Sequence, residues 1–138
     1  SETSQSYFQP PLEMHEIYYF EEIFINDIKI NAIKQNHGVI DTLGFIFNDV
    51  FAYCTDVVGF PEKSFEYLRK MKVLIITGLR QSPHMAHAHF DLSFEWIAKL
   101  NPDVAYLTHL SPESDHDVVT KLCPPNTYPA YDGLIINI

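Results

Sequence analysis

The amino-acid sequence predicts an α/β fold in which β-hairpins are followed by alternating helices and strands. The first part of the chain contains short runs of β-branched and aromatic residues separated by turn residues. The later part alternates stretches of helical hydrophobic periodicity with short apolar runs. This order predicts a sheet with helices on one face, so the opposite face needs a further cover.

Two hairpins are expected between residues 22 and 54. Asn26-Asp27 separates the apolar runs 22–25 and 28–33, and Asn48-Asp49 separates the runs 43–47 and 50–54. Asn and Asp tolerate the left-handed backbone conformations that tight turns require, so both pairs favour hairpin turns. Ahead of the hairpins, residues 1–16 are polar and contain Pro10-Pro11. We therefore expect a linker or lid segment over 1–16 and a folded unit over 17–138.

Helices and strands alternate after the second hairpin. Pro61 suits a first helical position, and Phe65, Leu68 and Met71 recur at helical spacing, which predicts a helix over 61–71. The apolar run 73–76 is typical of a strand buried on both faces. The other expected elements are helices over 91–100 and 113–122 and strands over 104–107 and 134–138.

Composition limits the class of protein. The 138 residues carry 46% hydrophobic residues and a net charge of −9, which indicates one globular domain with a real core. Nucleic acid is an unexpected partner, because phosphate binding depends on Lys and Arg. No apolar run has membrane-spanning length, and the two cysteines show no CxxC pairing, so we expect a cytoplasmic protein with reduced thiols.

Three polar residues follow predicted strands. His37, Asp56 and His109 each come after an apolar run. Ligands gather at the carboxyl ends of strands in α/β folds, and imidazole with carboxylate suits Zn, Mn or Fe. Taken singly, a histidine after a strand is more often a surface or hydrogen-bonded residue, and an aspartate before a turn is often a cap.

The segment 84–92, HMAHAHFDL, has the H-x-H-x-D spacing found in dinuclear metallohydrolases. Leu92 occupies the position of the final histidine of that motif, and the nearest predicted strand ends well before His87. We therefore do not expect a primary metal motif here. His84 and His87 are expected to be loop residues near the mouth of a site.

Three motifs in order carry a family resemblance: CTDVVGFPE at 54–62, Leu107-Thr108-His109, and AYDGL at 130–134. Together they resemble the C-terminal half of a metallo-β-lactamase-fold hydrolase of the PhnP-like branch, which includes cyclic-phosphate phosphodiesterases. The resemblance implies a partial αββα sandwich, with 17–138 as its C-terminal half. It also implies that this chain is a fragment, because the family's H-x-H-x-D-H motif is absent from it.

By this resemblance, His37 and His109 each hold one metal ion and Asp56 bridges the two. His89 matches the position proposed to protonate the leaving group, with His87 as the less favoured alternative. The complete enzyme is expected to use two divalent ions, Zn or Mn, whereas this chain alone should bind metal weakly. Tyr131-Asp132-Gly133 matches a signature close to the site, for which a structural role is expected first.

The favoured function is hydrolysis of small cyclic or nucleotide-like phosphodiesters by the complete protein. A tRNA-processing nuclease of the same fold is the first alternative, although the acidic composition disfavours it. The second is a non-catalytic binding or assembly module. An exposed apolar sheet face is expected to drive homodimer formation or other association.

Overall fold

The computed structural model describes residues 11–138, so most of the expected linker over 1–16 lies outside the described residues. Along the chain, the elements are β1 (Glu22–Ile25), β2 (Ile28–His37), β3 (Ile40–Phe47), β4 (Phe51–Cys54), α1 (Glu62–Leu68), β5 (Val73–Thr77), α2 (Phe90–Leu100), β6 (Val104–Thr108), α3 (His116–Leu122) and β7 (Thr127–Pro129). This is the order of elements that the sequence predicts, and the α/β fold class is confirmed.

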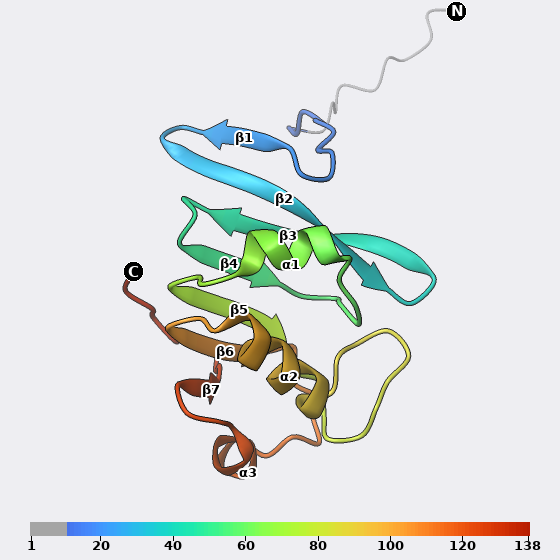
Figure 1. Cartoon of the computed structure of the whole chain (residues 1–138), viewed down its shortest axis with the longest axis vertical. Coiled ribbons are helices and arrows are strands. Elements are labelled where there is room, and N and C mark those ends of the chain that lie inside the picture. The colour runs from blue at the N-terminus through green and yellow to red at the C-terminus, as the bar shows by residue number, and fades with distance from the viewer. Residues whose placement is uncertain (1–10) are drawn as a thin grey trace, which may run out of the picture.

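The strands of residues 11–138 form one seven-stranded sheet in the order of the chain, β1 to β7 (Figure 1). Strands β1 to β4 pair antiparallel, and β4 to β7 pair parallel. Because β2 is two antiparallel steps from β4, it runs in the same direction as β4 to β7. The carboxyl ends of β2, β4, β5, β6 and β7 therefore meet along one edge of the sheet.

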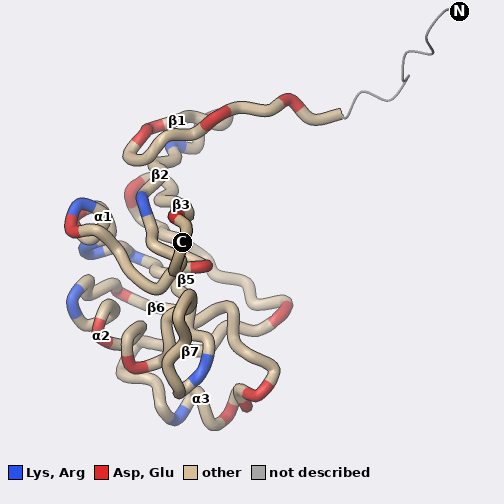
Figure 2. Tube along the Cα trace, turned by 90° about the vertical axis from the view of Figure 1, so that its right-hand side faces the viewer, with Lys and Arg blue, Asp and Glu red and all other residues tan. Residues whose placement is uncertain are grey.

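One face of the sheet carries the hydrophobic core. Helices α1 and α2 lie on this face (Figures 1 and 2). Two rows of paired residues lie on this face, and all are fully buried: Ala52, Leu74 and Ala105 in one row, Cys54, Ile76 and Leu107 in the next. The helices pack Phe65, Trp96 and Leu100 into the same core. This packing fixes the strand ends at which polar residues emerge.

The opposite face is aromatic. Side chains alternate between the two faces of a sheet, so a row of paired residues points away from α1 and α2: Phe45, Tyr53, Ile75, Tyr106 and Tyr128. Tyr53 is 40% exposed and Tyr128 is 47% exposed. The face predicted to need a further cover is therefore a real feature of the chain.

Some boundaries differ from the prediction. The last strand is β7 at Thr127–Pro129, not 134–138, because Thr127 pairs with Ala105 on β6 while Ile135 is 81% exposed. The strand predicted over 134–138 was wrong because the apolar residues of this segment do not pair with β6.

Two of the helices, α1 and α3, are also shorter than predicted. α3 begins at His116, since the Asp115 side chain caps it by accepting from the Val118 amide at 3.0 Å. α1 ends at Leu68, where Arg69 turns to an extended conformation. None of the helices in residues 11–138 has the length and apolar character needed to span a bilayer.

Candidate metal centre

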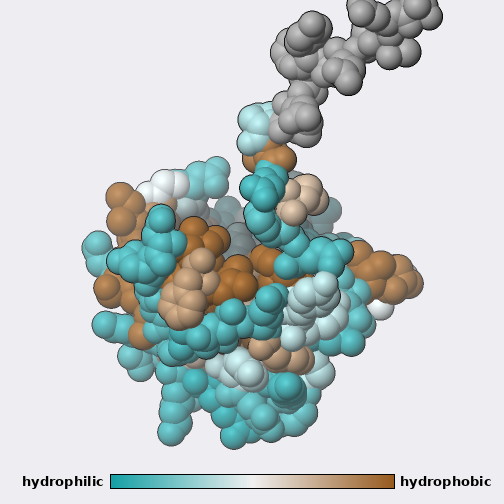
Figure 3. All heavy atoms as spheres, turned by 90° about the horizontal axis from the view of Figure 1, so that it is seen from above, coloured by the Kyte–Doolittle hydropathy of each residue, from teal (hydrophilic) through white to brown (hydrophobic). Residues whose placement is uncertain are grey.

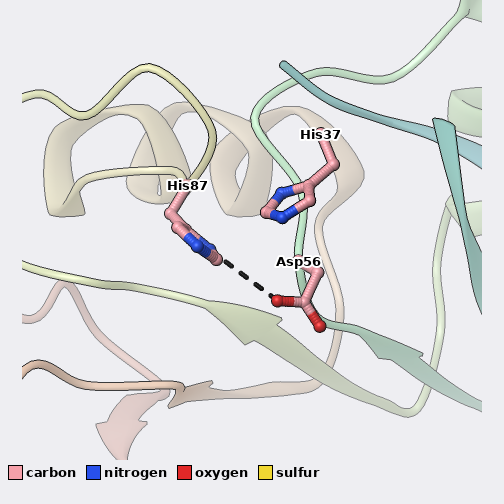
Figure 4. Close-up of side chains that lie close together, drawn as sticks. All are labelled: His37, Asp56 and His87. Atoms are coloured by element: carbon pink, nitrogen blue, oxygen red, sulfur yellow. Dashed lines mark ion pairs between the residues drawn. The ribbon is translucent and has the colours of Figure 1, made fainter. Parts of the chain in front are cut away.

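Four histidine and aspartate side chains meet at the carboxyl edge of the sheet. His37 is the last residue of β2, Asp56 follows β4, and His109 follows β6. The loop between β5 and α2 brings in His87. One ligand atom from each of His37, Asp56 and His87 lies within 4.8 Å of the others (Figure 4). Two of the three residues predicted from strand ends therefore converge here, together with a histidine from the loop.

His109 joins this group through two neighbours. Its Nε2 lies 3.9 Å from Asp56 Oδ1, and its ring stacks on that of His87 with centroids 4.7 Å apart. His87 Nδ1 lies 3.9 Å from the same Asp56 oxygen. Asp56 Oδ1 is thus shared by two imidazoles that come from different parts of the chain.

The hydrogen bonding of His37 fixes which of its nitrogens is available. His37 Nδ1 lies 2.7 Å from the carbonyl oxygen of Ala86. A carbonyl only accepts, so Nδ1 must carry the proton and donate it. The lone pair on Nε2 is then free to bind a metal ion, and the ring is held in place as for many metal-binding histidines.

His87 has a buried nitrogen without a partner. Its side chain is only 17% exposed, and Nδ1 makes no hydrogen bond within the described part of the chain. Burial lowers the pKa of His87, and the neighbouring imidazoles of His109 and His37 lower it further. Buried polar atoms are nearly always satisfied, so this nitrogen is available to a ligand or a water molecule.

Two residues of the group have a left-handed backbone. Asp56 has φ 55° and His109 has φ 61°. Non-glycine residues in this region carry strain, which persists only where the surrounding structure fixes it and which clusters at functional sites. Each conformation turns the chain sharply at a strand end, where the side chain enters the group.

His89, the predicted proton donor, stands at the start of α2. It is the N-terminal cap of α2, its backbone carbonyl accepts from the Ser93 amide, and it is not part of the group around Asp56. His84 stays in the loop, with its Nδ1 accepting from the Ala86 amide at 3.1 Å and its ring 5.2 Å from that of His87. The role of His89 was implied by the family resemblance, and the structure places this residue at the start of α2, which leaves His87 as the last histidine of the loop.

The residues present fit a divalent metal ion. Neutral imidazole nitrogens and a carboxylate are donors that Zn and Mn accept. His37 offers a defined free nitrogen, His87 has an unsatisfied one, and Asp56 offers a carboxylate that is 46% exposed. These three donors come from three different segments, which the sheet edge holds together.

Beside His109 lies a cavity of about 310 Å³. It is lined by Thr108, His109, Leu110, Ala130, Tyr131 and Asp132. The motif at 130–134 therefore contributes to the wall next to the histidine group, and its Tyr131 side chain is 59% exposed.

Comparisons with known proteins match both the sequence and the fold of this chain. Residues 2–110 match the family described as the beta-lactamase superfamily domain. A crystal structure described as a new diphosphatase from the PhnP family is 32% identical, with a TM-score of 0.84, and the match covers 88% of this chain and 47% of that one. No curated protein matches the sequence.

Two further structures share the fold at lower identity. The metallo-β-lactamase-fold protein YhfI from Bacillus subtilis is 13% identical with a TM-score of 0.71, covering 86% of this chain and 53% of that one. The short form of human tRNase Z is 16% identical with a TM-score of 0.61, covering 84% of this chain and 45% of that one. The chain thus spans about half the length of the structures it matches.

Proposed function

The chain belongs to the β-lactamase superfamily domain family, and from that premise we propose that it supplies part of the active site of a metal-dependent phosphodiesterase. Members of this family are hydrolases, and the fold is associated with divalent metal ions. The observation that carries the proposal is the convergence of His37, Asp56, His87 and His109 at one sheet edge. The substrates in view are small cyclic or nucleotide-like phosphodiesters.

Three residues of this chain would hold the metal ions. His37 would hold one ion through Nε2, His109 would hold the other, and Asp56 would offer its carboxylate to both. Such ions, when bound, polarise a phosphoryl group and activate water at neutral pH. We expect this chain to supply only part of the ligand set, since it spans about half the length of these relatives.

His87 is better placed than His89 to move a proton. It contacts the Asp56 and His109 side chains directly, whereas His89 starts a helix outside the group. A proton donor must reach the departing oxygen of the substrate, so geometry comes first. We therefore propose His87, in place of His89, as the proton donor. The competing role for His87 is metal coordination through its Nδ1.

The cavity beside His109 supports a small substrate. Its lining contains no Lys or Arg among the described residues, and Asp132 adds an acidic group. A second phosphate would be disfavoured there, while an uncharged leaving group would fit. This favours a phosphodiester over a diphosphate, although the 32% identical relative is described as a diphosphatase.

The exposed aromatic face of the sheet supports the proposal that the active protein contains a further part of this fold. Tyr53 and Tyr128 are exposed on a face that α1 and α2 leave open. We propose that the rest of the fold covers this face in the complete protein. In the chain alone, two copies would associate through it.

The test uses the protein that contains the rest of the fold. After chelation, activity on bis-p-nitrophenyl phosphate should return on addition of Mn²⁺ or Zn²⁺, and Asp56→Asn should not recover. His87→Gln should lower kcat by about 100-fold or more, the usual contribution of a general acid. His89→Gln is the matched control and should change kcat little.

Three outcomes would redirect the proposal. Metal binding without turnover of any phosphodiester favours a non-catalytic module. Turnover of precursor tRNA with no activity on the small substrate favours the nuclease alternative. If His87→Gln weakens metal binding but regains the wild-type kcat at saturating metal, His87 is a ligand and not the proton donor.

A further inference from the structure

The segment that carries Asp56 is held at every residue from 55 to 59. The Val57 carbonyl accepts from the Ala88 amide, and Asn36 bonds Val58 and Gly59 through its backbone, all at 2.8 Å. These are backbone bonds, which any sequence could make. The carbonyls of Thr55 and Asp56 are different, because side chains hold them.

Those two side chains are Gln35 and Thr42, which face each other across β2 and β3. Gln35 Nε2 donates to the Thr55 carbonyl at 2.9 Å and to Thr42 Oγ1 at 3.2 Å. Thr42 Oγ1 in turn donates to the Asp56 carbonyl at 2.8 Å. The chain of donors fixes the peptide groups on both sides of the Asp56 Cα.

The burial of the Gln35 side chain is energetically unfavourable. Its side chain is completely buried, and Oε1 has no hydrogen-bond partner among the described residues. An unsatisfied buried amide oxygen is unfavourable, so a purely structural core would do better with an apolar residue. The nitrogen of the same amide donates to the Thr55 carbonyl in the Asp56 segment and to Thr42 on β3.

Gly44 provides the room for this arrangement. A Cβ at position 44 would lie 2.5 Å from Gln35 Oε1 and 3.0 Å from Ile33 Cγ1. Gly44 has no left-handed backbone, so conformation does not require a glycine there. Glycine is required at position 44 because a larger residue would collide with the Gln35 side chain.

We propose that Gln35 and Thr42 are positioning residues that hold Asp56 in its left-handed conformation, so that its carboxylate faces His87 and His109. This rests on the metal-binding role proposed above for Asp56. Neither residue belongs to the ligand group, and each acts only through the carbonyls of Thr55 and Asp56. The φ of 55° at Asp56 is the strained conformation that these bonds maintain.

The decisive variant is Thr42→Val, which keeps the shape and suits a strand but lacks the hydroxyl. In the protein containing the rest of the fold, it should weaken Mn²⁺ binding, measured by calorimetry, about 10- to 100-fold, as loss of an outer hydrogen bond does at metal sites. In the metal-free protein, the Val58 amide should exchange faster with deuterium, whereas the Phe90 amide should not change. Thr42→Ser should restore both quantities.

The matched control is Thr120→Val. Thr120 Oγ1 also donates to a backbone carbonyl, that of His116 at 2.7 Å, but on α3. This variant should leave Mn²⁺ affinity and Val58 exchange unchanged. Gly44→Ala should reproduce the Thr42→Val effects, because it displaces the Gln35 amide.

The outcomes separate this inference from the proposed function. If Asp56→Asn abolishes Mn²⁺ binding while Thr42→Val alters neither affinity nor Val58 exchange, the positioning role is wrong and the metal site stands. If Asp56→Asn leaves Mn²⁺ binding intact, the proposed metal role fails. In that case, deuterium exchange of the Val58 amide in Thr42→Val alone decides whether Gln35 and Thr42 hold the backbone at Asp56.

Discussion

His37 donates a hydrogen bond from Nδ1 to the carbonyl oxygen of Ala86, 2.7 Å away and 49 residues along the chain. This bond joins the end of β2 to the loop that carries His87. It also determines which nitrogen of His37 is free. One contact therefore sets the tautomer of His37 and helps to place the neighbouring histidine.

Replacing His37 with Phe keeps a planar ring but removes the donor. The amides of residues 84 to 88 should then exchange faster with deuterium, and the free energy of unfolding should fall by about 1 kcal/mol, as for a lost hydrogen bond. His116→Phe removes a similar bond to the Pro129 carbonyl on the α3 side and should leave this loop unchanged. Unaltered exchange in His37→Phe would mean that the backbone bonds of Ala88 hold the loop alone.

The left-handed conformation of His109 predicts which of two substitutions at this position is the more stable. An L-residue in this region costs about 1–2 kcal/mol, which glycine avoids. His109→Gly should therefore be more stable to urea than His109→Ala by about 1 kcal/mol, although both lose the imidazole. At Lys99, inside α2, the order should reverse, because glycine is the poorer helix former. Equal stability of His109→Ala and His109→Gly would show that the backbone at His109 carries no strain.

The meeting of His37, Asp56 and His109 was predictable from sequence because each follows an apolar run and parallel strand ends share an edge. The place of His87 was not predictable in this way, since it depends on the course of a long loop. That course is set by distant contacts, such as the Ala88 amide with the Val57 carbonyl. The strand expected over 134–138 failed for a related reason. Apolar letters indicate a strand only where a partner edge exists, and β6 pairs with Thr127–Pro129 instead.

The aromatic sheet face leads to a prediction about association. In the 138-residue chain, Tyr53→Ser with Tyr128→Ser should weaken self-association at least about tenfold, since each buried aromatic contributes on the order of 1.5–3 kcal/mol. Sedimentation equilibrium measures this directly. Phe24→Ser with Ile25→Ser is the matched control, because these residues are 64% and 57% exposed on β1.

That control addresses a second apolar region. Figure 3 looks down on the β1 edge and shows hydrophobic groups exposed there. If the β1 pair weakens association and the tyrosine pair does not, edge-to-edge pairing through β1 drives association and the open face does not. Addition of the remaining part of the fold should abolish association only if the open face is responsible.

The two cysteines should differ in reactivity and in their effect on alkaline stability. Cys54 is fully buried, and burial raises the pKa of its thiol far above the ordinary value of 9.0. Burial also raises the pKa of Cys123, which is only partly buried. Because the thiolate is the reactive species, iodoacetamide at pH 8 should spare Cys54 until the protein unfolds.

The raised pKa of Cys54 also means that the folded protein loses stability at alkaline pH. The unfolded chain loses the Cys54 proton near pH 9, whereas the folded chain keeps it, so the stabilising contribution is complete below pH 9 and is lost as the pH rises further. Between pH 9 and 10 the free energy of unfolding should fall by about 1 kcal/mol from this group. Urea titrations under reducing conditions should show that Cys54→Ala lacks this part of the fall, while Cys123→Ala retains it. An identical alkaline fall in the wild type and Cys54→Ala would mean that the thiol is accessible to solvent, which is incompatible with its place beneath α1 and α2.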